Sequence, residues 1–143
     1  MNQLLPNQFF IRSYQPTDYP QVKTLLQEAG LFDEAMDAQI HLDQKIKTFP
    51  GSILIASSAK QIVGCLIIVA DFGPFLFRLA VKKPFRRQGL GTKLLTTAET
   101  HLRQHHHREA ILFVAYKNQD LINFYKKRGY QLGHVFRGMY KEL

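Results

Sequence analysis

One stretch of the sequence decides the fold: Leu79-Ala80-Val81-Lys82-Lys83-Pro84-Phe85-Arg86-Arg87-Gln88-Gly89-Leu90-Gly91-Thr92-Lys93-Leu94-Leu95. It continues a largely apolar run over residues 75–81, which predicts a buried strand that ends before Pro84. From Leu90 the apolar residues recur every three or four positions, as on one face of a helix. We therefore expect a strand, a basic turn over residues 86–91 that contains glycines, and a helix.

This turn has the chemistry of a phosphate site. The first amides of a helix have no partner within it and together carry about half a positive charge. Gly89 and Gly91 allow a ligand to approach the backbone, and Arg86 and Arg87 add full positive charges. A pyrophosphate is a natural ligand for such a turn. A solvated basic turn is the alternative, because neither a Walker loop nor a three-glycine dinucleotide fingerprint is present.

A second stretch further along the chain is Asn118-Gln119-Asp120-Leu121-Ile122-Asn123-Phe124-Tyr125-Lys126-Lys127-Arg128-Gly129-Tyr130. Together the two stretches resemble the GNAT family of N-acetyltransferases. In that family an Arg/Gln-x-x-Gly-x-Gly/Ala turn binds the pyrophosphate of acetyl-CoA, and Arg86, Gly89 and Gly91 match it. A later Asn, a Phe-Tyr pair and a Gly-Tyr/Phe pair mark the family's last helix and the following strand, and the second stretch matches them.

The resemblance implies an acyltransferase that moves an acetyl group from acetyl-CoA to a primary amine by direct transfer through a ternary complex. The end of the strand would pair with the pantetheine arm, a backbone amide near Leu79 would polarise the thioester carbonyl, and the amides of the turn would hold the phosphates. The implied cofactor-binding residues are Leu79, Ala80, Val81, Arg86, Arg87, Gln88, Gly89, Leu90, Gly91, Thr92 and Asn118. Acetyl-CoA is then the co-substrate, and no metal is implied.

Tyr125 is the catalytic residue that the resemblance implies, as general acid to the departing thiolate. A phenol with a pKa of about 10 can donate a proton and remain neutral at pH 7. The alternative is that Phe124 and Tyr125 are core aromatics at the end of a helix, and for Phe124 this is the preferred interpretation.

The sequence does not provide an obvious general base. The strand over 75–81 contains only Arg78 as a charged residue. Candidates at strand edges or between strands are Asp71, Glu109 and His134, and each is better explained as structural or solvated. A base acting through water, or an acceptor that is already partly neutral, remains open. A non-catalytic module that binds or senses acyl-CoA is therefore the alternative function.

The acceptor amine would be a small molecule or a protein amino group, chosen by the first two helices and the loop before the central strand. Acidic residues in this region are Asp33, Glu34, Asp37 and Asp43, which we interpret as helix N-terminal charges with an amine-attracting rim as the alternative. An aromatic wall of Phe72, Phe75 and Phe77 is a further possibility. The histidines between His101 and His107 lack the carboxylate or cysteine spacing that would complete a metal site, so structural or solvent roles are expected.

Composition supports one globular domain over residues 1–143. Of the 143 residues, 45% are hydrophobic and 21% charged, and the formal net charge is +8. The basic excess lies beside the two proposed cofactor motifs, so nucleic acid is not expected as a partner. The chain has no apolar run of membrane length and no signal-like start, and its single Cys65 suits a reducing compartment. We expect a cytoplasmic protein without a membrane partner, and a homodimer is possible.

The expected order of elements is β-α-α-β-β-β-α-β-α-β-β. The predicted strands comprise residues 9–14, 53–56, 61–70, 75–81, 110–115, 130–132 and 135–140, and the helices comprise one capped by Thr17, a second over 33–48, a long one from Leu90 and a last one over 121–128. This is the α/β (α+β) order of the GNAT fold. It implies a mixed, mostly antiparallel central sheet flanked by helices and splayed in the middle to hold acyl-CoA.

Overall fold

The computed structural model describes residues 8–59 and 61–143 of the chain. Its contacts divide the chain into two compact units, and the division falls between Leu112 and Phe113. The two units are considered separately below. That the whole chain forms one domain stays a prediction.

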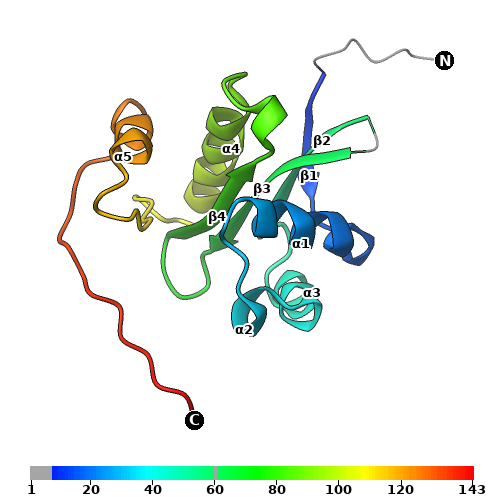
Figure 1. Cartoon of the computed structure of the whole chain (residues 1–143), viewed down its shortest axis with the longest axis horizontal. Coiled ribbons are helices and arrows are strands. Elements are labelled where there is room, and N and C mark those ends of the chain that lie inside the picture. The colour runs from blue at the N-terminus through cyan, green and yellow to red at the C-terminus, as the bar shows by residue number, and fades with distance from the viewer. Residues whose placement is uncertain (1–7, 60) are drawn as a thin grey trace. The chain divides into compact units, whose positions relative to one another are not determined.

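The first unit contains most of the regular structure (Figure 1). Its strands are β1 (Phe10–Ser13), β2 (Ile53–Ser58), β3 (Gln61–Val69) and β4 (Phe75–Val81). Its helices are α1 (Tyr19–Glu28), α2 (Glu34–Asp37), α3 (Gln39–Thr48) and α4 (Leu90–Gln104), with short 3-10 turns η1 (Pro16–Asp18) and η2 (Lys83–Phe85). The bounds of β4 and the start of α4 are those that the apolar pattern predicts.

The sheet has the order β1-β2-β3-β4, and every neighbouring pair is antiparallel. A parallel bridge between Phe75 and Ile111 makes the pairing mixed. Backbone hydrogen bonds support this bridge, from the Leu76 amide to the Ile111 carbonyl at 2.9 Å and from the Ile111 amide to the Pro74 carbonyl at 2.7 Å. The expected fold class, a mostly antiparallel sheet flanked by helices, is confirmed. The splay for acyl-CoA stays a prediction.

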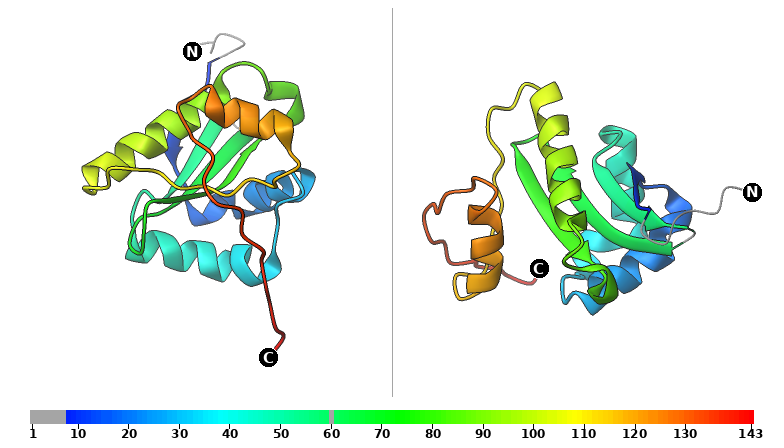
Figure 2. Two further views of the ribbon diagram at one scale, coloured as in Figure 1. Left: turned by 90° about the vertical axis from the view of Figure 1, so that its left-hand side faces the viewer. Right: turned by 90° about the horizontal axis from the view of Figure 1, so that it is seen from above.

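Helices cover both faces of the sheet, with α4 on one face and α1 to α3 on the other (Figure 2). One core cluster gathers Val22, Leu25, Leu26 and Leu42 of the helices with Ile53, Ile55, Ile62, Cys65, Ile67 and Ala80 of the sheet. On the α4 side the buried residues are Leu90, Leu94, Leu95, Ala98 and Leu102. Because both faces are covered, β3 is buried over almost its whole length, which explains its continuous apolar run.

The early helices begin differently from the prediction. Thr17 is not a helix cap, since η1 precedes α1 and the residue before α1 is Asp18. The helix expected over residues 33–48 is interrupted at Ala38, whose φ of −59° and ψ of 148° are not helical. Asp33 does cap α2, because its Oδ1 accepts a hydrogen bond from the Ala35 amide at 2.9 Å.

The second unit, residues 113–143, contains the helix α5 (Gln119–Lys126) and no strand. The strand predicted over 110–115 is reduced to the bridge at Ile111, and those predicted over 130–132 and 135–140 do not form. A strand requires a neighbour for its backbone groups, and residues 113–143 do not pair with one another. The expected termination of the last helix is confirmed at Gly129, where φ is +89°.

Candidate functional site

The basic turn before α4 has the backbone that an anion site requires. Gly89 occupies the position before the helix with φ of +78°, in the left-handed region, and it has no side chain that could cap the helix. A Cβ added at Gly89 would meet no described atom within 4 Å. The Gly89 carbonyl accepts from the Lys93 amide at 3.0 Å, so the amides of Leu90 and Gly91 belong to the first turn and have no acceptor within the helix.

Cationic side chains surround this turn. Arg86, Arg87 and Gln88 are exposed. Nε of Arg86 donates to the Val81 carbonyl at 2.8 Å, which links the turn to the end of β4. A cavity of about 480 Å³ opens at the same place, lined by Gln8, Phe9, Phe10, Gln88, Gly89, Leu90 and Lys93. Positive charge, helix amides and an open surface thus meet at one point.

The strand before the turn contains an irregularity. In the register of β3 and β4, Cys65 pairs with Ala80 and Ile67 with Phe77, so Arg78 and Leu79 together face Leu66. This is a β-bulge, with one extra residue on β4. Beyond the bridge at Phe75, the described residues up to Leu112 form no strand pairing with the other edge of β4. Leu79, Ala80 and Val81 therefore present one strand edge without a strand neighbour within this unit.

An ion pair that the sequence did not predict fastens the bulge. Nε of Arg78 donates to both carboxylate oxygens of Asp37, at 3.1 and 3.0 Å. Asp37 is 2% exposed and also accepts from the Asp33 amide at 2.9 Å. An arginine inside an otherwise apolar strand was the signal for this pair, because a buried guanidinium requires a carboxylate.

Most of the acidic residues that were candidates for attracting an acceptor amine make hydrogen bonds within the protein. Asp33 caps α2, Asp37 binds Arg78, and Asp43 accepts from the Tyr14 hydroxyl at 3.0 Å. Glu34, which is exposed, lies 4.0 Å from Nζ of Lys23. The structural interpretation of these carboxylates is therefore the better one.

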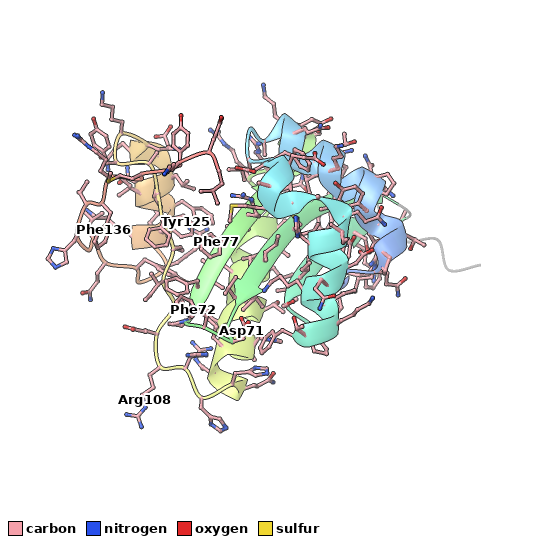
Figure 3. All side chains as sticks on the ribbon, turned by 90° about the horizontal axis from the view of Figure 1, so that it is seen from below. Asp71, Phe72, Phe77, Arg108, Tyr125 and Phe136 are labelled. Carbon is pink, nitrogen blue, oxygen red and sulfur yellow. The ribbon has the colours of Figure 1, made fainter. Side chains whose placement is uncertain are left out.

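A row of aromatic rings runs from the turn between β3 and β4 onto β4. The rings of Phe72 and Phe75 stack at 6.3 Å, and those of Phe75 and Phe77 at 6.1 Å. Figure 3 shows Asp71 and Phe72 at the turn and Phe77 on the strand. The expected aromatic wall is present, and its role toward an acceptor stays a prediction. Asp71 and Glu109, considered as bases, are exposed.

The second unit contains the other two predicted site residues, Asn118 at the N-cap of α5 and Tyr125 within the helix. The Asn118 side chain caps the helix by accepting from the Leu121 amide at 3.2 Å. Tyr125 is 8% exposed, and its ring lies edge-on to those of Phe124 at 5.2 Å and Tyr130 at 5.5 Å. Burial raises the pKa of the Tyr125 phenol above 10, opposed in part by the positive charge of Arg128. His134, the third candidate base, is exposed.

The histidines near the end of α4 pack against one another. The rings of His101 and His105 stack at 4.5 Å, and Phe49 lies 5.4 Å from the first and 4.7 Å from the second. His107 uses Nε2 to contact the Ala70 carbonyl at 2.8 Å. Among residues 8–59 and 61–143, no three His, Cys, Asp or Glu side chains are grouped as metal ligands would be. The rings serve packing in this arrangement.

The fold and the turn define an α/β protein in which the N-terminal amides of α4 follow β4 and lie beside cationic side chains. The family model described as "Acetyltransferase (GNAT) family" matches residues 12–130. The chain therefore belongs to the GNAT acetyltransferase family, as the two sequence motifs indicate.

One known protein is similar in sequence to part of this chain. The chain is 32% identical over 76 residues to the uncharacterized protein YdhI of Bacillus subtilis (strain 168), a match that covers 53% of this chain and 47% of YdhI. The matched stretch thus spans about half of that curated relative.

Solved structures share the fold. Ard1 from Thermoplasma volcanium superposes with a TM-score of 0.76 at 23% identity, over 88% of this chain and 84% of Ard1. The PaiA N-acetyltransferase of Thermoplasma acidophilum, solved with coenzyme A, gives 0.76 at 19% identity, over 90% and 93% of the two chains. Glucosamine-6-phosphate N-acetyltransferase from Arabidopsis thaliana gives 0.73 at 18% identity, over 94% and 99%. At these identities the similarity shows the fold alone.

Of the helices within the described residues, none is both long enough and apolar enough to cross a membrane.

Proposed function

We propose that this protein is an acetyl-CoA-dependent N-acetyltransferase that moves the acetyl group to a primary amine by direct attack in a ternary complex. Membership of the GNAT family supports acetyl transfer as the chemistry. The observation that carries the proposal is the turn at Gly89, where an uncovered left-handed glycine opens the first amides of α4 to a ligand beside exposed arginines.

Each part of the cofactor has a candidate partner. The diphosphate binds the amides of residues 87–92 and the side chains of Arg86 and Arg87. The pantetheine arm pairs with the edge of Leu79–Val81 that has no strand neighbour within the first unit, where the Val81 carbonyl already accepts from Arg86, and with Asn118. The amide near Leu79 polarises the thioester carbonyl, which becomes an oxyanion when the amine attacks.

The transfer then requires two proton movements. The amine nitrogen forms a bond to the carbonyl carbon, the C–S bond breaks, the amine loses a proton, and the departing thiolate of coenzyme A gains one. We assign the last step to Tyr125. Its raised pKa supports this role, because the phenol keeps its proton at neutral pH and transfers it only when a strongly basic thiolate forms.

A specific observation favours a second candidate function, a module that binds acyl-CoA without turnover. The one charged side chain of β4 is Arg78, and the carboxylate that faces it, Asp37, is buried and bound to the arginine. Asp71 and Glu109 are exposed. A base would then have to act through water, or the acceptor would have to supply a neutral amine.

For the acceptor we propose a small-molecule amine or a protein amino group. Structural neighbours include glucosamine-6-phosphate N-acetyltransferase and the diaminobutyrate acetyltransferase EctA of Paenibacillus lautus, which was solved with its substrate L-2,4-diaminobutyric acid. We place the reaction in the cytoplasm, with no membrane or nucleic-acid partner. A homodimer is compatible with the proposal.

Turnover tests the proposal directly. Purified protein is incubated with acetyl-CoA and a panel of amines, while release of the coenzyme A thiol and the product masses are recorded. Tyr125→Phe should lower kcat by about 100-fold or more, because general acid catalysis contributes on that order. Tyr116→Phe, at an exposed tyrosine of the same unit, is the matched control and should leave kcat unchanged.

The outcomes separate the two candidates. Binding of acetyl-CoA with no thiol release on any amine would favour the binding module. Turnover that Tyr125→Phe leaves intact would remove Tyr125 from the mechanism and keep the transferase. No binding of either coenzyme A or acetyl-CoA would refute both.

A further inference from the structure

The bulge in β4 contains a strained residue. Arg78 has φ of +57°, in the left-handed region that residues with side chains rarely adopt. In bulges of this kind the first position is usually glycine. Arg78 departs from that rule inside a strand that is otherwise apolar. Such strain persists only where the surroundings impose it, and it often marks a site with a function.

Three hydrogen bonds to two residues hold this strained residue, two through its side chain and one through its carbonyl. Its guanidinium Nε donates to both oxygens of the buried Asp37, which belongs to α2. Its carbonyl accepts from the thiol of Cys65 on β3, at a sulfur–oxygen distance of 3.4 Å. Cys65 is fully buried, which raises its pKa to about 12, so the thiol keeps the proton that it donates.

The chain contains a similar ion pair that lacks the strain. Arg12 on β1 donates to both oxygens of Asp18, at 2.7 and 2.9 Å, and Asp18 also accepts from the Gln15 amide at 2.8 Å. Arg12 is not among the residues with positive φ. Both pairs join a strand arginine to a carboxylate that also binds a backbone amide. Only the pair at Arg78 fixes a bulge, and Leu79 is the next residue.

We infer that Asp37 and Arg78 are positioning residues for acetyl transfer: the ion pair fixes the bulge, and the bulge aims the Leu79 amide at the thioester carbonyl. This inference rests on the proposed function. Because Asp37 belongs to α2, the ion pair also links two regions of the proposed site. It joins α2, in the region expected to choose the acceptor, to β4, the strand expected to bind the cofactor. Neither side chain takes part in bond making. They act through the backbone of Leu79.

The test compares the two ion pairs. Asp37→Asn and Arg78→Lys are measured beside the matched variants Asp18→Asn and Arg12→Lys. We expect the first two to lower kcat by about 10- to 100-fold, because small misplacements of a reacting group have effects of this size. The dissociation constant for coenzyme A, which lacks the thioester, should stay that of the wild type. The matched variants should retain wild-type kcat at comparable losses of thermal stability.

A spectroscopic readout tests the same inference without turnover. In ¹⁵N-labelled wild-type protein, acetyl-CoA should shift the Leu79 amide proton downfield relative to coenzyme A, because the carbonyl accepts from it. Asp37→Asn should abolish this difference, and Asp18→Asn should keep it. If Asp37→Asn does not fold, Arg78→Lys provides the same comparison.

The inference and the proposed function fail in different ways. If the wild type shows the Leu79 shift but acetylates no amine, the proposed transferase function is overturned. The Leu79 shift in the variants then decides the positioning role. Equal kcat and equal Leu79 shifts in the two sets of variants overturn the positioning role and leave the transferase intact. A wild-type Leu79 amide that does not distinguish acetyl-CoA from coenzyme A also overturns the positioning role.

Discussion

Replacement of Gly89 by alanine separates the strain of the turn from its role in binding. At φ of +78° a side chain costs about 1–2 kcal/mol in backbone energy. The added methyl group would meet no described atom within 4 Å, so no steric clash adds to this cost. We expect Gly89→Ala to lower the free energy of unfolding by about 1 kcal/mol, and the melting temperature by about 3 °C for a chain of this size.

The effect on cofactor binding should be larger. The methyl group would project where the diphosphate approaches the amides of Leu90 and Gly91. Loss of one hydrogen bond to a charged group costs about 1.5–3 kcal/mol. The dissociation constant for coenzyme A should therefore rise by about 10- to 100-fold. Isothermal titration calorimetry with coenzyme A measures it, and urea denaturation measures the stability.

Gly30→Ala is the matched control. Gly30 follows α1 with φ of +69°, and a Cβ there also meets no described atom within 4 Å. This variant should lose about the same stability, because the backbone cost is the same, and should bind coenzyme A like the wild type. If both variants bind coenzyme A equally well, the amides of α4 are not the diphosphate site. If Gly89→Ala loses no stability, the strain assigned to this turn is wrong.

Three further predictions concern the core and the titrating groups. Leu94→Ala should lower the free energy of unfolding by about 3 kcal/mol, because it leaves a cavity at a fully buried position on α4. The control Thr96→Ala, at an exposed position of the same helix, should change it by less than about 0.5 kcal/mol. Equal losses for the two variants in urea denaturation would contradict the packing of α4. Burial and the neighbouring His105 lower the pKa of His101 below 6.5 in the folded protein. The contribution of neutral His101 to stability is therefore complete above pH 6.5 and is lost as the pH falls through the folded-state pKa. The urea midpoint should drop as the pH falls below 6.5, and it should drop less in His101→Gln. Because the pKa of Tyr125 is raised, the phenol keeps the proton that it donates at pH 10. If Tyr125 is the general acid, the rate should decrease with rising pH only above pH 10. The same decrease in Tyr125→Phe would contradict the role of Tyr125 as general acid.

Local patterns predict the first unit well. Alternating or continuous apolar runs predict all four strands, and the bounds of β4 agree to the residue. The three-to-four spacing after Leu90 predicts α4, and the left-handed backbone observed before it suits the glycine at position 89. These features depend on neighbours in the sequence, so the sequence alone defines them.

Features that depend on distant partners are predicted poorly. The apolar run after residue 110 and the tail over 130–140 have strand-like composition, but a strand also needs a paired neighbour, and residues 113–143 provide none for one another. Thr17 is a suitable cap by residue type, but η1 places Asp18 before α1, and its carboxylate binds Arg12.

The candidate site divides in the same way. A motif with fixed spacing predicts the turn residues, and the structure begins α4 at Leu90 as expected, whereas their role in binding stays a prediction. The Asp37–Arg78 pair spans 41 positions, and no local pattern connects a short helix to a bulge. The roles of Tyr125 and Asn118 stay predictions, to be decided by the kinetics described above.

The hydrogen bond from Cys65 to the Arg78 carbonyl gives the protein an internal reporter. The chain has a single cysteine, and its thiol is protonated and fully buried in the native state. An alkylating reagent can therefore modify the protein only when the packing around the sulfur opens, either between β3 and β4 or where α1 and α3 pack on the same core cluster. The labelling rate of one sulfur atom then measures how often the core around Cys65 opens, and protection by coenzyme A would show how strongly the ligand keeps it closed.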